Sequence, residues 1–265
     1  SSAASDVYKR QINNINTFLR DFLKIEFSKL TEEEKNSLVS KKYTKQKSIP
    51  DPVNRIVLLK NRIRKEKGLK EIITLRQFQE DADIINHLRT KFRGVLNWCP
   101  RLGKTIASID AILKLKCKKV CIGVPSLNLA QQWYNELDKY CGHILILVDK
   151  NIDSTKLKQI FDENSDSDII VITTYYSAYK INNCRAFFDI KIADEAHHLT
   201  YSAYENGTDK DFRNFHNIKS TYSLSLTGSL KIGGKDKIVG NDNTDLFGEI
   251  IDTKSLSWAI RENLV

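Results

Sequence analysis

The stretch Trp-Cys-Pro-Arg-Leu-Gly-Lys-Thr at residues 98–105 decides the fold of this 265-residue chain. It ends in the Gly-Lys-Thr of a phosphate-binding loop, where backbone N–H groups at a helix N-terminus surround phosphate oxygens. Lys104 can neutralise those phosphates, and the Thr105 hydroxyl can ligate Mg²⁺. Trp98 stands where such a loop usually begins with glycine. We therefore expect the wrapping to come from residues around the lysine, namely Leu102, Gly103, Lys104, Thr105 and Ile106.

A second segment, Asp194-Glu195-Ala196-His197, ends an apolar run about ninety positions later. Asp194 at a strand end can hold hydrated Mg²⁺, and Glu195 is placed to take a proton from an attacking water. Taken alone, Gly-Lys-Thr occurs by chance in many chains, and an acidic pair often marks a solvated strand end or a helix N-cap. The two segments in this order, each after a β-like run, predict nucleoside triphosphate hydrolysis with Lys104, Asp194 and Glu195 as the catalytic residues.

Short apolar runs alternate with amphipathic segments from residue 73 onward. This alternation predicts an α/β fold in which a parallel sheet is covered by helices on both faces. The predicted strands are 94–97, 120–124, 144–148, 169–173, 190–193 and 222–226.

Two helices should pack on this sheet. After Gly103, a stripe of Ile106, Ile109 and Leu113 predicts a helix whose N-terminus points at the phosphates. A second helix over about 127–140 should turn Leu129, Trp133 and Leu137 inward. Two polar stretches, 202–217 and 231–245, are predicted to be surface loops.

The amino-acid composition limits the classes to which this protein can belong. A hydrophobic share of 41% can fill a core. No run approaches the roughly 20 apolar residues of a membrane span, and no secretory signal is visible at the N-terminus. The five cysteines include no Cys-x-x-Cys pair, which argues against a disulfide framework or a zinc site. We expect an intracellular protein with reduced thiols and no membrane partner.

The net charge of +9 lies in residues 1–70, which hold 17 Lys and Arg against 8 Asp and Glu, whereas the other 195 residues hold 25 of each. The densest basic run is Lys60, Arg62, Arg64, Lys65, Lys67 and Lys70. It could follow a nucleic-acid backbone, and it fits a solvated helical face at least as well. Residues 12–70 are predicted to form a basic helical segment. Residues 1–11 resemble a translated sequencing adapter, and we expect the natural start to be missing.

Further motifs indicate a family. Leu75-Arg76-Gln77-Phe78-Gln79 precedes the loop, Val124-Pro125-Ser126 follows a predicted strand, and Leu226-Thr227-Gly228-Ser229 follows the acids. Together with 98–105 and 194–197, these segments resemble the first RecA-like domain of a superfamily 2 DEAH-type helicase, as in type III restriction subunits, UvrB-like proteins and related translocases. The resemblance implies a RecA-like P-loop domain over 71–265.

That resemblance assigns roles residue by residue. It implies that Gln79 and Arg76 help to bind the adenine of ATP, with Mg²⁺ held by Thr105 and Asp194. His197, Thr227 and Ser229 would couple nucleotide state to movement, although Leu230 replaces the usual proline. The segments expected to contact nucleic acid contain Pro125, Ser126, Gln132, Thr173 and Thr174, whereas Trp133 is expected in the core.

The implied activity is that of an ATP-hydrolysing motor that acts on nucleic acid, DNA rather than RNA. Residues 246–265 resemble the segment that leads toward a second RecA-like domain, whose arginines would complete the site. Without that domain we expect weak nucleotide binding and very slow hydrolysis. Two alternatives stay open: a non-unwinding ATP switch in a remodelling or restriction complex, and an unrelated P-loop kinase.

Overall fold

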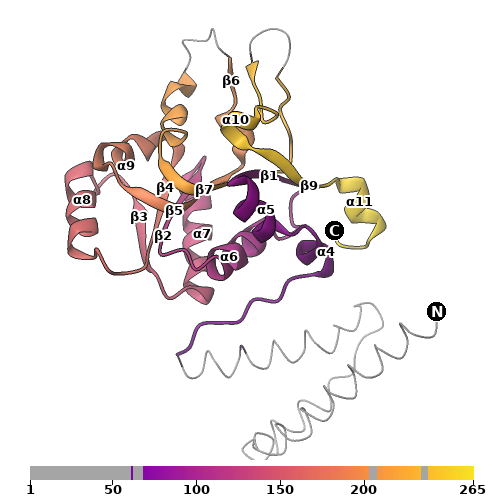
Figure 1. Ribbon diagram of the computed structural model, residues 1–265, viewed down its shortest axis with the longest axis horizontal. Helices are drawn as coiled ribbons and strands as arrows, with labels where there is room; N and C mark the ends of the chain where they lie inside the picture. The colour runs from indigo at the N-terminus through magenta and orange to yellow at the C-terminus, as the bar shows by residue number, and fades with distance from the viewer. Residues whose placement is uncertain (1–60, 62–67, 203–207, 234–237) are drawn as a thin grey trace, which may run out of the picture. The chain divides into compact units, whose positions relative to one another are not determined.

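Seven parallel strands form a single sheet in the order β3-β4-β2-β5-β7-β1-β9 (Figure 1). The computed structural model describes residue 61 and residues 68–202, 208–233 and 238–265, all within the compact unit Pro52–Val265. The strands are β1 (Arg93–Trp98), β2 (Lys119–Val124), β3 (Ile144–Val148), β4 (Ile169–Thr174), β5 (Phe187–Asp194), β7 (Lys219–Thr227) and β9 (Glu249–Lys254).

The six predicted strands are confirmed. β4, the second strand from one edge of the sheet, is buried along its whole length, and it is rich in β-branched residues. The sequence prediction missed β9, which pairs with β1 in parallel. This strand lies at the sheet edge, and its sequence Glu-Ile-Ile-Asp-Thr-Lys carries charged residues that hide the strand pattern.

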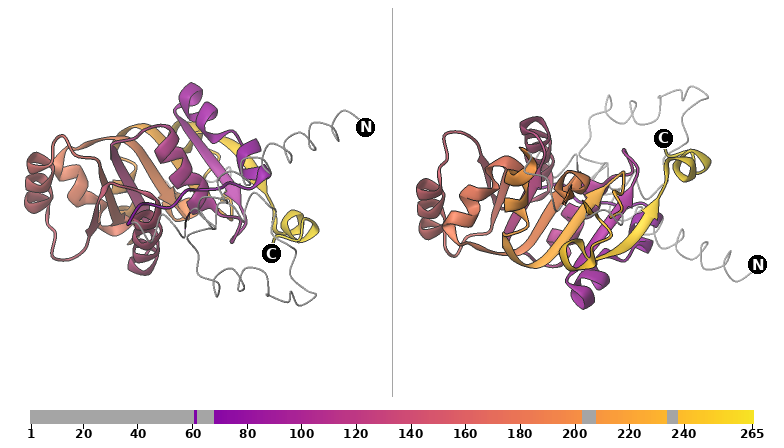
Figure 2. Two further views of the ribbon diagram at one scale, coloured as in Figure 1. Left: turned by 90° about the horizontal axis from the view of Figure 1, so that it is seen from below. Right: turned by 90° about the horizontal axis from the view of Figure 1, so that it is seen from above.

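Helices cover both faces of the sheet, as predicted (Figure 2). One face packs against α4 (Gln77–Asp81), α5 (Ile84–Lys91), α6 (Lys104–Lys114), α7 (Leu127–Tyr140) and α11 (Leu256–Arg261). The other packs against α8 (Ser154–Glu163), η1 (Tyr175–Ser177), α9 (Ala178–Cys184), η2 (Ala196–Leu199), η3 (Thr208–Phe215) and α10 (Thr244–Phe247). The chain therefore has the RecA-like α/β architecture.

The predicted inward stripe of α6 needs a correction. Ile109 is buried, but Leu113 is 38% exposed and Ile106 is only partly buried. α6 contacts α5 and α7 as well as the sheet, so its buried face is centred on Ala107–Ala111 and Leu113 lies at its edge. On α7, Trp133 and Leu137 are buried as predicted, and Leu129 is partly buried against the same core.

The two stretches predicted as surface loops are more ordered than expected. η3 lies in the first, and its Phe215 is fully buried against the sheet. In the second, β8 (Ile238–Val239) pairs antiparallel with β6 (Tyr201–Ser202), and Asn241 is buried. The prediction was wrong there because single buried side chains in a polar stretch carry no periodic signal.

The expectations for residues 1–60 and 62–67 lie outside the described residues, including most of the basic run. Lys70 is described, and its ammonium pairs with Asp138 at 3.0 Å. All five cysteines are free, and burial raises the pKa of Cys117 and Cys121 to about 12, which keeps both as thiols. In the described ranges, no helix combines the length and apolarity that a membrane crossing requires.

Gly123 on β2 gives a test of this packing. A methyl group there would overlap the ring of Phe215, which lies directly on the strand. We expect Gly123→Ala to lower the free energy of unfolding by about 1–3 kcal/mol because the ring must move out of its packed position. Gly142→Ala, where nothing lies within 4 Å, is the matched control. Urea denaturation measures both, and equal stabilities would contradict the packing of Phe215 on Gly123.

Candidate active site

The phosphate loop joins the end of β1 to the start of α6. Two of its residues have left-handed backbone angles, Arg101 at φ 71° and Gly103 at φ 79°. A Cβ on Gly103 would also lie 2.6 Å from the Gln79 amide nitrogen. Glycine is therefore required at this N-cap by both conformation and space. The amides of residues 104–106 in the first turn of α6 precede its hydrogen-bond ladder, as an anion site requires.

Lys104 is buried in this loop, and its Nζ donates to the Trp98 carbonyl at 2.7 Å. The Trp98 indole in turn donates to the Asp252 carboxylate at 2.7 Å, while the Cys99 amide donates to the Lys254 carbonyl. β9 thus anchors the start of the loop. The bond to Asp252 requires an indole at position 98, where a glycine would have no side chain to make it. The sequence could not reveal this contact because β9 was not predicted.

Gln79 on α4 holds the loop from its other side. Its side-chain nitrogen donates to the carbonyls of Leu102 at 3.0 Å and Gly103 at 3.2 Å. Its oxygen accepts from the Arg76 amide at 2.8 Å. Both amide protons are therefore engaged by loop carbonyls. Contact of Gln79 with adenine stays a prediction, as does that of the exposed Arg76.

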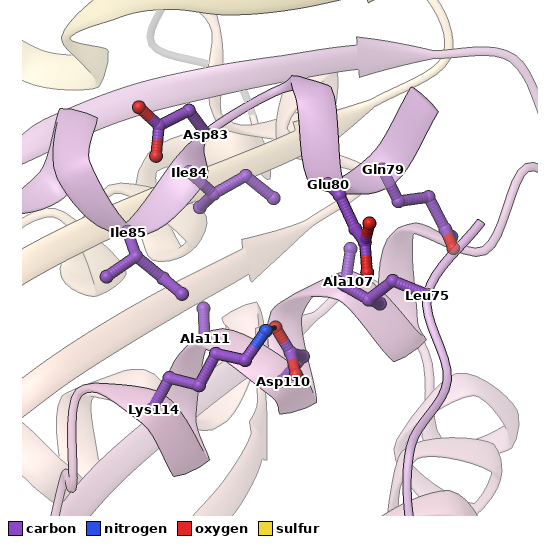
Figure 3. A pocket seen from close by; sticks show the side chains of 10 residues that line it. All are labelled: Leu75, Gln79, Glu80, Asp83, Ile84, Ile85, Ala107, Asp110, Ala111 and Lys114. Atoms are coloured by element: carbon purple, nitrogen blue, oxygen red, sulfur yellow. Dashed lines mark ion pairs between the residues drawn. The ribbon is translucent and has the colours of Figure 1, made fainter. Parts of the chain in front are cut away.

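A cavity of about 240 Å³ lies beside Gln79, between α4, α5 and α6 (Figure 3). Ala107 and Ala111 form part of its wall, and Lys114 folds back toward Asp110, with which it pairs at 2.9 Å. Glu80 and Asp83 also line it, and the Glu80 carboxylate points into the cavity whereas that of Asp83 points away from it (Figure 3). The cavity thus has apolar walls with charged groups around them, next to the predicted adenine segment.

Asp194, the last residue of β5, is only 7% exposed. Its two carboxylate oxygens accept separate hydrogen bonds, from the Trp133 indole at 2.8 Å and from the Glu195 amide at 3.0 Å. Burial raises the pKa of Asp194, while the Trp133 bond and the charge of Lys104 act in the opposite direction. Trp133 is thus in the core, as predicted, and it also serves the acid pair, which sequence reasoning missed.

Glu195 follows in a left-handed conformation, with φ 52°, at the turn into η2. Its side chain is 31% exposed, and its carboxylate lies 3.4 Å from His197 Nδ1. The two neighbouring carboxylates therefore have different surroundings. One is buried and hydrogen-bonded, whereas the other reaches solvent, as a group that meets water must.

His197 links the acids to the end of β7. Its Nδ1 lies 3.2 Å from the Thr227 hydroxyl, which donates its single proton to the Ser229 carbonyl. The proton between the ring and Thr227 must therefore sit on Nδ1. Burial, followed by the nearby His198, lowers the pKa of His197 and favours this neutral form. The structure thus brings together the three residues predicted to couple, and leaves His198 exposed.

Asn241 supports the same turn and was not predicted. It is fully buried, its amide donates to the Ala196 carbonyl at 3.1 Å, and its oxygen accepts from the Lys231 amide at 3.1 Å. A buried asparagine in a polar stretch gives no sequence signal without its partners.

The predicted magnesium ligands fit that ion. Thr105 and Asp194 line one cavity, together with Gln132 and Trp133 from α7. A carboxylate oxygen that accepts one hydrogen bond keeps a further lone pair for a cation. Within the described ranges no group of three or more His, Cys, Asp or Glu side chains could hold a metal. Mg²⁺ does not need one, because it usually keeps water and substrate phosphates as ligands.

The sequence matches the family described as "Type III restriction enzyme, res subunit" over residues 65–232. The chain belongs to this family. It is accordingly an N-terminal superfamily 2 helicase-like ATPase domain, as its motifs indicated. A search of curated proteins gives no match.

Two solved structures share the fold of this res-subunit domain. The ATP-dependent Type ISP restriction-modification enzyme LlaBIII bound to DNA has a TM-score of 0.61 and 23% identity, covering 74% of this chain and 16% of that one. A nuclease-deletion mutant of the Type ISP enzyme LlaGI in complex with a DNA substrate mimic has a TM-score of 0.60 and 23% identity, covering 72% and 21%. This chain therefore spans only about a sixth to a fifth of the length of these longer proteins.

The segments predicted to contact nucleic acid have local roles in this domain. Ser126 caps α7 by accepting from the Leu129 amide, and Gln132 is exposed on the same helix. Thr173 is fully buried, and the Thr174 hydroxyl caps η1. Pro125 is partly exposed. Their contact with nucleic acid stays a prediction.

Gln79 provides a test of the loop geometry. We expect Gln79→Ala to lower the free energy of unfolding by about 1–3 kcal/mol, because the partly buried Arg76 amide and two loop carbonyls lose their partner. Gln77→Ala removes an exposed amide from the same helix and should change it by less than about 0.5 kcal/mol. Equal effects in urea denaturation would contradict the role of Gln79 as a loop support.

Proposed function

We propose that the chain is the ATP-binding and hydrolysing motor domain of a DEAH-type superfamily 2 helicase or translocase that acts on DNA. One observation carries this proposal: Thr105 of the phosphate loop and Asp194 of the acid pair line a single cavity. They meet because β5, β7 and β1 are neighbours in the sheet and all end at the same edge.

The phosphate loop supplies the ground-state contacts. The amides at the start of α6 and the Lys104 ammonium would hold the triphosphate, since both offer positive charge to the phosphate oxygens. Thr105 and Asp194 would hold Mg²⁺, which when bound neutralises charge on the phosphates. Gln79 would keep the loop closed and take part in adenine recognition.

Glu195 is the proposed base. Its carboxylate reaches solvent, unlike that of Asp194, and can accept a proton from water as the oxygen attacks the terminal phosphate. His197 Nδ1 lies between Glu195 and Thr227, so a change at the acid pair would reach the 227–229 turn through one ring. This supports the coupling role of His197, Thr227 and Ser229.

DNA is the proposed nucleic-acid partner, because the two solved structures that share the fold are described as a DNA-bound enzyme and a complex with a DNA substrate mimic. Pro125, Ser126, Gln132, Thr173 and Thr174 are the proposed contact segments. Phosphate contacts require hydrogen-bond donors on rigid elements, and α7 and β4 provide such elements. A second RecA-like domain would supply the arginines that accelerate phosphoryl transfer, a contribution of about 10³–10⁵ in comparable enzymes.

Nucleotide binding tests the loop assignment. We expect Lys104→Ala to weaken the affinity for a fluorescent ATP analogue with Mg²⁺ by about tenfold or more, because a charge-assisted phosphate contact is lost. Lys118→Ala changes an exposed lysine after α6, outside the loop and the cavity beside Gln79, and serves as the control. Unchanged affinity in Lys104→Ala would refute the phosphate site.

Hydrolysis tests the acid. Glu195→Gln should bind the same analogue with wild-type affinity, while ATP turnover in the presence of duplex DNA falls by at least about a hundredfold, since no base remains. Single-turnover assays with excess protein give the readout. Equal turnover in both proteins would remove Glu195 from the mechanism, and stimulation by RNA but not DNA would contradict the proposed partner.

A further inference from the structure

Two aromatic side chains from different elements meet at Asp194. The Trp133 indole on α7 donates to its carboxylate, and the Tyr175 hydroxyl on η1 donates to its backbone carbonyl. Both donors are buried, and Tyr175 is held by the rings of Phe212 and Phe215. The proposed magnesium ligand is therefore fixed from two directions by neutral hydrogen-bond donors.

Each donor belongs to an element that starts from a proposed nucleic-acid segment. α7 begins after Ser126, which caps it, and carries the exposed Gln132 next to Trp133. Gln132 and Trp133 line the same cavity as Thr105 and Asp194. Tyr175 directly follows Thr174 at the end of β4. Each residue bonded to Asp194 thus directly follows a residue of a proposed contact segment in the sequence.

We infer that Trp133 and Tyr175 are positioning residues for Asp194, the proposed magnesium ligand. Nucleic acid bound to the Ser126–Gln132 and Thr173–Thr174 segments would change the orientation of the Asp194 carboxylate through them. This inference rests on the proposed function. A helix moves as a rigid body, so a displacement at the start of α7 shifts Trp133 with it. Hydrogen bonds weaken steeply as their geometry departs from the optimum, so a small shift changes the orientation of the carboxylate.

The inference requires coupling between two ligands, and linkage makes that coupling measurable from either side. Affinity for the fluorescent ATP analogue with Mg²⁺ is measured with and without a saturating short duplex DNA, and then again in EDTA. We expect DNA to tighten the wild-type Mg²⁺-dependent affinity by about fivefold or more, the lower end of usual allosteric couplings. In EDTA the effect of DNA should disappear.

Two variants remove the donors while they keep a ring. In Trp133→Phe and Tyr175→Phe the effect of DNA on Mg²⁺-dependent affinity should fall below about twofold, with DNA affinity in the absence of nucleotide unchanged. Tyr140→Phe removes a hydroxyl from the far end of α7 and should retain the full coupling. Tyr175→Phe keeps the side-chain volume, so it remains informative if Trp133→Phe folds poorly.

Indole resonances give a second readout that does not need nucleotide. The chain has three tryptophans, Trp98, Trp133 and Trp258, and the Trp133 peak is assigned by its loss in Trp133→Phe. We expect duplex DNA alone to shift the Trp133 Nε1–H peak, and to shift it less in Tyr175→Phe. The Trp98 indole, bonded to Asp252 instead, serves as the internal reference.

The outcomes are distinguishable. If the wild-type chain binds neither nucleotide nor DNA, the proposed function fails. If it binds both without coupling, or if both Phe variants keep full coupling, the inference is overturned while the proposed function stands. A loss of affinity that is equal with and without DNA would make Trp133 and Tyr175 purely structural and would also overturn it.

Discussion

The parallel alignment of β5, β7 and β1 is the constraint on which the rest of the structure depends. Because these strands are neighbours and run in one direction, their carboxyl ends place the acid pair, Thr227 and the phosphate loop at one sheet edge. Buried apolar side chains on both faces hold the register, and a shift by one residue would turn Asp194 toward the opposite face. The chemistry of the site therefore follows from the packing of the sheet.

Polar groups around this edge are held almost entirely by one another. Gln79 fixes the loop, Trp133 and Tyr175 fix Asp194, and Asn241 supports the turn after the acids. Such buried networks stabilise one arrangement because an unpaired member would lose water without replacement.

The two carboxylates show how position separates roles. Asp194 and Glu195 are neighbours in sequence, yet one ends a buried strand and the other begins an exposed turn. Burial raises the pKa of Asp194, and a cation beside it would reverse that effect. Glu195 keeps access to water. The proposed metal ligand and the proposed base thus lie next to each other in the chain with different access to water.

The sequence by itself determined the six strands with β-branched runs, the two-faced α/β fold and the family, because periodicity and short motifs are local properties. It also predicted which side chains form the site, and the structure places three of them, His197, Thr227 and Ser229, within hydrogen-bonding distance along one path. Only the tertiary structure placed the charged strand β9 beside the loop and gave Trp133, Tyr175 and Asn241 their partners. Those contacts join residues far apart in the chain, and no local pattern records them.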